Sequence, residues 1–177
     1  MSLPKPIPGL VISYSYLWVR EHEKGAEEGR KNRPCAIVAA RRVVEGREVI
    51  TVVPVTHSPP ADPADAVEIP APLKAHLGLD DTPSWIVVTE TNDFLWPGPD
   101  LRPIAGSKPS RFDYGMLPPR FYAYLRDRFC SLTRAGRSSR FGEQSSCMRP
   151  EEHETSSVPG DDRFTVIPYE AKDRNPS

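Results

Sequence analysis

The sequence lacks long hydrophobic runs, paired cysteines and an excess of either charge. No apolar stretch reaches the roughly 18 residues that a membrane-spanning helix needs, and the chain does not begin with a basic segment followed by an apolar one. We therefore expect a cytoplasmic protein without membrane contact. The cysteines Cys35, Cys130 and Cys147 have no paired spacing, which favours neither a disulfide framework nor a metal site. Cys35 is expected to be a small core residue.

Glycine is scarce relative to proline, with 11 Gly against 21 Pro in 177 residues. Because proline interrupts helices and central strands, this ratio argues against long continuous helices and predicts short strands joined by loops. The length suits one domain with some additional chain. We assign residues 1–132 to that domain. Residues 133–177 are rich in Ser, Arg, Glu and Pro without apolar periodicity, which predicts a disordered tail.

Basic residues are almost missing from the middle of the chain. Residues 48–100 contain one base and nine acids, whereas residues 20–47 and 102–140 are predominantly basic. The two basic segments would give a face for a polyanion if they folded together. Ordinary solvated surface charge is the alternative interpretation.

The hydrophobic pattern predicts a mainly β protein with a few helices. Strands are expected at residues 10–18, 34–44, 48–55 and 84–91, the first three pairing antiparallel. Residues 20–32 and 59–72 are expected to be a charged loop and a proline-rich excursion, and residues 94–103 an edge strand or turn. A short helix over residues 73–79 should end near Gly78, and an amphipathic helix over residues 118–131 should dock on the sheet.

Arg33 is the first candidate for a site. It precedes Pro34 and an unbroken apolar stretch, so an arginine is fixed at the start of a buried strand. A guanidinium keeps its charge at neutral pH, and its donors match two phosphate oxygens. Thr56 ends the neighbouring strand, where its hydroxyl would lie close to Arg33. The alternatives are a strand-end arginine that caps a carbonyl or pairs with a glutamate, and an ordinary β-branched strand residue.

His57 follows Thr56 directly. Histidine is well suited to move a proton at neutral pH. Neighbouring strand residues point to opposite faces, so His57 shares a site with Thr56 only if the strand has ended there. We consider a catalytic or substrate-contacting role, with a surface or loop-anchoring histidine as the alternative. Ser58, the next residue, is a candidate RNA contact.

Further candidate RNA contacts lie in the charged loop and on aromatic rings. Lys24, Arg30 and Lys31 lie in a glycine-containing loop, a composition that attracts phosphates; a solvated loop neutralised by its own glutamates is the alternative. Trp96 and Trp18 have rings that unpaired bases stack on. Core or interface packing is the more common role for such side chains.

Three short motifs occur in a recognisable order: Gly9 before the first strand, Arg33-Pro34 at the start of the second, and Pro54-Val55-Thr56 at the end of the third. Their order and spacing resemble the MazF/PemK family of toxin endoribonucleases over about residues 9–130. The segments "THSPPADPADAVEIP" and "FLWPGPDLRP" are similar to a PemK-like branch.

The resemblance implies an SH3-like small β-barrel with a C-terminal amphipathic helix. It also implies a homodimeric toxin that needs no metal or cofactor, is inhibited by a cognate antitoxin, and cleaves single-stranded RNA. Attack by the 2'-hydroxyl would leave 2',3'-cyclic phosphate and 5'-hydroxyl ends, with Arg33 and Thr56 in the central roles. Two alternatives stay open: a non-catalytic module that binds RNA or protein, and a toxin of this fold that binds a topoisomerase.

Overall fold

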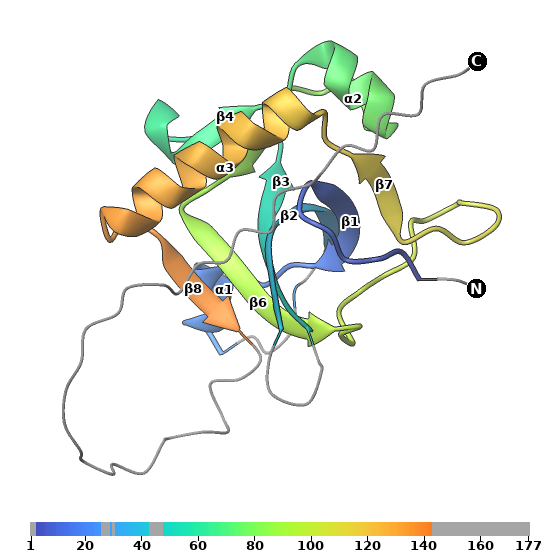
Figure 1. Ribbon diagram of the computed structural model, residues 1–177, viewed down its shortest axis with the longest axis horizontal. Helices are drawn as coiled ribbons and strands as arrows, with labels where there is room; N and C mark the ends of the chain where they lie inside the picture. The colour runs from blue at the N-terminus through green and yellow to red at the C-terminus, as the bar shows by residue number, and fades with distance from the viewer. Residues whose placement is uncertain (1–2, 26–28, 30, 43–47, 143–177) are drawn as a thin grey trace, which may run out of the picture.

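Strands dominate the computed structural model, which describes residues 3–25, 29, 31–42 and 48–142 (Figure 1). The elements in chain order are β1 (Leu10–Ser15), α1 (Val19–His22), β2 (Asn32–Arg42), β3 (Glu48–Thr56), η1 (Pro63–Asp65), β4 (Ala66–Glu68), α2 (Ala71–Leu77), β5 (Trp85–Val87), β6 (Glu90–Trp96), β7 (Asp113–Met116), α3 (Pro119–Arg134) and β8 (Ser139–Gly142). The prediction of a mainly β chain with a few helices is confirmed for these residues.

The strands form one curled sheet in the order β4-β5-β3-β2-β1-β7. The predicted antiparallel arrangement of β1, β2 and β3 is confirmed. β5 and β6 follow one another along the other side of β3, where β5 pairs with the end of β3 and β6 pairs with its first half. β8 adds to β6 in parallel. The predicted strand over residues 84–91 is therefore interrupted after Val87, because its two halves pair with different parts of β3.

Both faces of the curled sheet are buried. Val11 and Val53 belong to a core cluster that also holds Leu125, Phe129 and Leu132 of α3. Residues at alternate positions of the same strands, such as Ile12 and Cys35, face a second cluster with the aromatic side chains of β1 and β6. The predicted docking of the C-terminal helix and the predicted core position of Cys35 are both confirmed (Figure 1).

The short helix α2 ends as predicted. Gly78 has φ 66° and ψ 31°, the left-handed conformation that glycine adopts readily, and its N–H donates to the carbonyls of Lys74 and Ala75. Leu73 and Leu77 are buried on the inner side of this helix. The proline-rich excursion before it contains η1 and β4, which the sequence did not predict.

Several elements differ from the sequence-based expectations. β6 pairs with β3 over residues 92–96 and with β8 over residues 90–93, so residues 94–96, where the edge strand was predicted to begin, pair with β3 alone and do lie at an edge. Residues 133–142, assigned by composition to the tail, form the end of α3 and strand β8. The remainder of that tail and residues 43–47 lie outside the described residues. In the described part of the chain, no helix combines the length and apolar character needed to cross a membrane.

Candidate functional site

The pairing of β2 with β3 stops at the residues that precede the candidate site. The last pair is Cys35 with Pro54, after which β2 continues along β1 and β3 along β5. Proline has no N–H, so neither Pro34 nor Pro54 can donate to a ladder. Arg33 and Thr56 each lie two residues beyond the last pair, and side chains two apart share a face. The strands therefore present Arg33 and Thr56 on the same face, at adjacent strand ends.

Arg33 is half-buried against an aromatic ring. Its guanidinium carbon lies 5.0 Å from the centre of the Trp18 ring, and that of Arg20 lies 5.6 Å from the same ring. The Nε atom of Arg33 is buried without a hydrogen-bond partner, and no ion pair of Arg33 is formed within the described residues. Cation–π contacts contribute roughly 2 kcal/mol when desolvated. The ring thus supports a cation whose donors lack protein acceptors in this part of the chain.

Tyr16 is a component of this region that the sequence analysis did not single out. Its side chain is 1% exposed, and its hydroxyl has no hydrogen-bond partner among the described residues. Its ring packs edge-on to Trp18 with 5.2 Å between ring centres. Burial raises the pKa of Tyr16 above its usual range, Cys35 and Glu90 add to the rise, and Arg33 opposes it. The hydroxyl therefore stays protonated and able to donate.

Cys35 and Glu90 are two further ionisable groups near Tyr16. Burial raises the pKa of the Cys35 thiol, so this side chain stays neutral. The Glu90 carboxylate accepts the backbone N–H of Val19 at 3.2 Å. In the described structure it forms no ion pair with Arg33.

Thr56 is half-buried at the last position of β3. Its Oγ1 accepts the backbone N–H of Ser58 at 3.1 Å. A hydroxyl also carries one proton, so Thr56 can still donate to a further acceptor. Ser58 itself is exposed.

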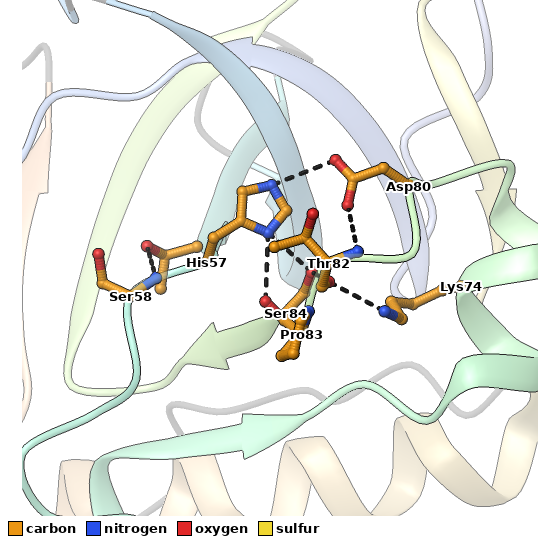
Figure 2. Close-up of polar contacts among 8 residues, drawn as sticks. His57, Ser58, Lys74, Asp80, Thr82, Pro83 and Ser84 are labelled. Carbon is orange, nitrogen blue, oxygen red and sulfur yellow. Dashed lines mark hydrogen bonds and ion pairs between the residues drawn. The ribbon is translucent and has the colours of Figure 1, made fainter.

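His57 lies just after the end of β3. The alternation of side chains within a strand therefore does not by itself direct His57 away from Thr56. Its ring is turned toward the connection between α2 and β5, as Figure 2 shows. Nε2 lies 3.3 Å from Oδ2 of Asp80, and Nδ1 lies 3.2 Å from the carbonyl oxygen of Pro83 and 3.1 Å from Oγ of Ser84. These contacts anchor the loop after β3 to the loop before β5.

The set Asp80, His57 and Ser84 has the residue types of a hydrolytic triad but not its chemistry. Ser84 is 1% exposed, and its hydroxyl donates to the carbonyl of Thr82 at 2.8 Å. Because the Ser84 hydroxyl proton is used in that bond, Nδ1 of His57 faces two acceptors, the Ser84 oxygen and the Pro83 carbonyl, and has to act as a donor. Nε2 faces the Asp80 carboxylate. Because Nδ1 acts as a donor in this arrangement, His57 does not accept the Ser84 proton, and the cluster does not activate a serine.

Asp80 is the acidic partner in this cluster. The backbone N–H of Thr82 donates to its Oδ1 at 2.9 Å and holds the pKa of the carboxyl below its usual range, with His57 and Lys74 adding to the effect. Lys74 is 5% exposed, and its ammonium group donates to the carbonyl of Thr82 at 2.9 Å.

The other predicted RNA contacts lie in different surroundings. Lys24 and Lys31 are exposed, and Arg30 lies outside the described residues. Trp96 is half-buried against the second core cluster, with its ring centre 6.0 Å from that of Phe94. No contact in the described structure joins these side chains to Arg33 or Thr56.

The arginines of the second basic segment are largely engaged within the protein. Arg126 pairs with Asp127 at 2.9 Å, and Arg128 donates to the carbonyl of Ala64 at 2.8 Å. Arg137 pairs with Asp62 at 3.2 Å and with Asp65 at 2.9 Å. The contacts of Arg128 and Arg137 fix η1 to the C-terminal half of α3 and to the turn that follows it. The positive charge of these three arginines is thus matched by nearby acceptors.

Comparisons with known proteins add no family assignment, since no family model, no curated protein and no solved structure matches the chain. Within the described residues, His, Cys, Asp and Glu side chains form no group of three or more that could hold a metal ion. The function therefore has to be inferred from the residues at the ends of β1, β2 and β3.

Proposed function

We propose that this chain is a metal-independent endoribonuclease that cleaves single-stranded RNA, with the scissile phosphate held by Arg33 and Thr56. The observation that carries the proposal is the state of Arg33: a half-buried cation, supported by Trp18, without an acceptor among the described residues. The curled, mainly β sheet suits the SH3-like barrel of the MazF/PemK family. Membership of that family is part of the proposal.

The proposed reaction is attack of a 2'-hydroxyl on the adjacent phosphorus, in which the 2'-proton passes to solvent water, the 2'-oxygen–phosphorus bond forms and the bond from phosphorus to the 5'-oxygen breaks. Negative charge grows on the non-bridging oxygens, and preorganised donors stabilise it best where water is excluded. Arg33 supplies charged donors and Thr56 supplies a hydroxyl proton. His57, in its protonated form, is the candidate that donates a proton to the leaving oxygen. The products are a 2',3'-cyclic phosphate and a 5'-hydroxyl.

The remaining parts of the proposal concern contacts and partners. Lys24, Arg30, Lys31 and Ser58 would contact the RNA backbone, and Trp96 a base. By the family resemblance, the enzyme would act as a cytoplasmic homodimer controlled by a small antitoxin protein.

A non-catalytic module that binds RNA or protein, including a topoisomerase-binding toxin, is the second candidate. It is favoured by one observation: Thr56 and His57 are both already engaged, Thr56 by Ser58 and His57 by Asp80 and the loop before β5. His57 would have to leave these partners before it exchanged a proton with RNA.

The deciding experiment incubates the purified chain with several unrelated single-stranded RNAs in EDTA. We expect cleavage with cyclic phosphate ends, a loss of roughly 100-fold or more for Arg33→Ala, since removing one oxyanion donor costs about 3 kcal/mol, and a clear loss for Thr56→Ala. Arg126→Ala is the matched control, because its guanidinium pairs with Asp127 on α3. Intact RNA with every substrate would contradict the proposal, and salt-dependent RNA binding without cleavage would support the module.

A further inference from the structure

Two buried donors beside Trp18 lack acceptors in the described structure. They are the Tyr16 hydroxyl and the Arg33 Nε. Leaving a buried donor unpaired costs about 1 to 3 kcal/mol, so native proteins rarely keep two such groups together without a reason. Both are donors, and one belongs to a permanent cation. The group that would satisfy them is therefore an acceptor, and the charge of Arg33 favours an anion.

The backbone brings the two side chains to the same place. Arg33 is paired with Tyr14 across β1 and β2. Tyr16 lies just after the end of β1 and belongs, with Tyr14 and Trp18, to the second core cluster. Both side chains contact Trp18: the planes of the Tyr16 and Trp18 rings meet at 69°, and the Arg33 guanidinium carbon lies 5.0 Å from the centre of the Trp18 ring. The indole ring is thus a neighbour that both side chains share.

We propose that the Tyr16 hydroxyl and the Arg33 guanidinium together bind one phosphate group, with Trp18 as the apolar wall beside it. The inference rests on the proposed function for the source of that phosphate, which is the phosphodiester at the cleaved position of the RNA. Tyr16 thereby becomes a substrate-binding residue that the strand-end motifs do not include.

The protonation states around the pair suit an anion. Because burial raises the pKa of Tyr16, its hydroxyl keeps its proton through the ordinary pH range and acts as a donor. The thiol of Cys35 is neutral for the same physical reason. Glu90 is the acid that influences Tyr16, and its carboxylate is held by the N–H of Val19.

The test measures binding without requiring cleavage. Inorganic phosphate, and then a DNA oligonucleotide that lacks the attacking 2'-hydroxyl, are titrated into the full chain by calorimetry. We expect Tyr16→Phe to weaken both affinities roughly tenfold or more, the usual size of a lost hydrogen bond to a charged group. Its melting temperature should be unchanged or higher, because the unpaired hydroxyl is removed while the ring remains.

Tyr122→Phe is the matched control. Its hydroxyl donates to the carbonyl of Val38 at 3.2 Å, away from Trp18, so both affinities should stay at the wild-type value. Arg33→Lys is the second variant: it keeps the charge, removes the Nε donor and should also weaken phosphate binding.

The possible results separate the two proposals. Phosphate binding that depends on Tyr16 and Arg33, without RNA cleavage by wild type, would support the anion site and reject the endoribonuclease. If wild type cleaves RNA and Tyr16→Phe has the same phosphate affinity and the same cleavage rate, the result would support the endoribonuclease and overturn the role of Tyr16. Absence of phosphate and DNA binding by wild type would also overturn this inference.

Discussion

At the scale of single residues, the neighbouring Trp18 ring sets how strongly the arginine at the start of β2 can interact with an anion. An indole ring removes part of the hydration of a guanidinium without neutralising its charge. Arg33 is held in this way by Trp18, and Arg20 approaches the same ring. A partly dehydrated cation interacts more strongly with an arriving anion than a fully hydrated one does. This is the physical reason for choosing Arg33 over the exposed lysines of the neighbouring loop.

The cluster around His57 gives a residue-scale prediction about pH. The pKa of Asp80 is lowered in the folded state, so its stabilising contribution is present above the usual carboxyl range near pH 4 and is lost as pH falls through the lowered value. We expect Asp80→Asn to destabilise the protein at pH 7 by at most about 1 kcal/mol, because the pair is largely exposed. The difference in melting temperature from wild type should shrink toward pH 3.

Asp81→Asn is the control for that series, since Asp81 is an exposed neighbour outside the cluster. Its effect on melting temperature should be small at every pH. A difference between wild type and Asp80→Asn that persists unchanged at pH 3 would contradict the assigned role of the carboxylate.

At the scale of elements, a loop and a helix position the strand ends. Gly29 returns the chain to β1, and a Cβ placed there would lie 2.4 Å from the carbonyl oxygen of Tyr16. The hydroxyl of Ser15 also donates to the carbonyl of Gly29 at 3.0 Å. Only glycine fits this approach, so the loop between α1 and β2 is fixed beside Tyr16 at this point. On the other face, α3 supports the sheet through its buried leucines and Phe129.

The docking of α3 gives an element-scale prediction. Leu125 is fully buried between the helix and the sheet, whereas its neighbour Tyr124 is 55% exposed. We expect Leu125→Ala to lower the free energy of unfolding by about 2 to 5 kcal/mol through lost burial and a cavity. Tyr124→Ala should change it by less than about 1 kcal/mol. Urea denaturation of both variants measures this, and equal losses would contradict the docking arrangement.

At the scale of the whole molecule, the basic side chains that are free in the folded structure are not distributed as the basic segments of the sequence suggest. In the second basic segment, Arg126, Arg128 and Arg137 are matched by Asp62, Asp65 and Asp127 and by backbone carbonyls, whereas Lys108, Arg120 and Arg134 are exposed. In the first basic segment, Lys24 and Lys31 are exposed and have no recorded partner within the described residues. Lys24 and Lys31 are therefore available to an approaching polyanion, whereas Arg126 and Arg137 are already paired with carboxylates.

This distribution predicts how nucleic-acid binding depends on salt. The slope of log affinity against log salt reports the number of phosphates neutralised, at about 0.7 per phosphate for a single strand. With a DNA oligonucleotide as an uncleavable probe, Lys24→Ala and Lys31→Ala should each reduce the slope by about that amount. Arg126→Ala and Arg137→Ala should leave it close to wild type. Larger reductions from Arg126→Ala or Arg137→Ala would contradict the assignment of the phosphate contacts to Lys24 and Lys31.

The sequence by itself determined the antiparallel strands β1 to β3, the cap of α2 at Gly78 and the docking face of α3. These features follow from local signals: alternation of apolar residues, one left-handed glycine and a helical repeat. It also indicated Arg33 and Thr56, because strand ends and prolines are visible in the chain.

Only the tertiary structure decided the surroundings of those residues. The addition of β8 to β6, the placing of Arg33 on Trp18, and the turning of His57 to Asp80 all depend on segments distant in sequence. Such contacts are set by pairing register, loop closure and the satisfaction of buried polar groups. None of these leaves a periodic signal in the sequence, because each depends on which segments meet.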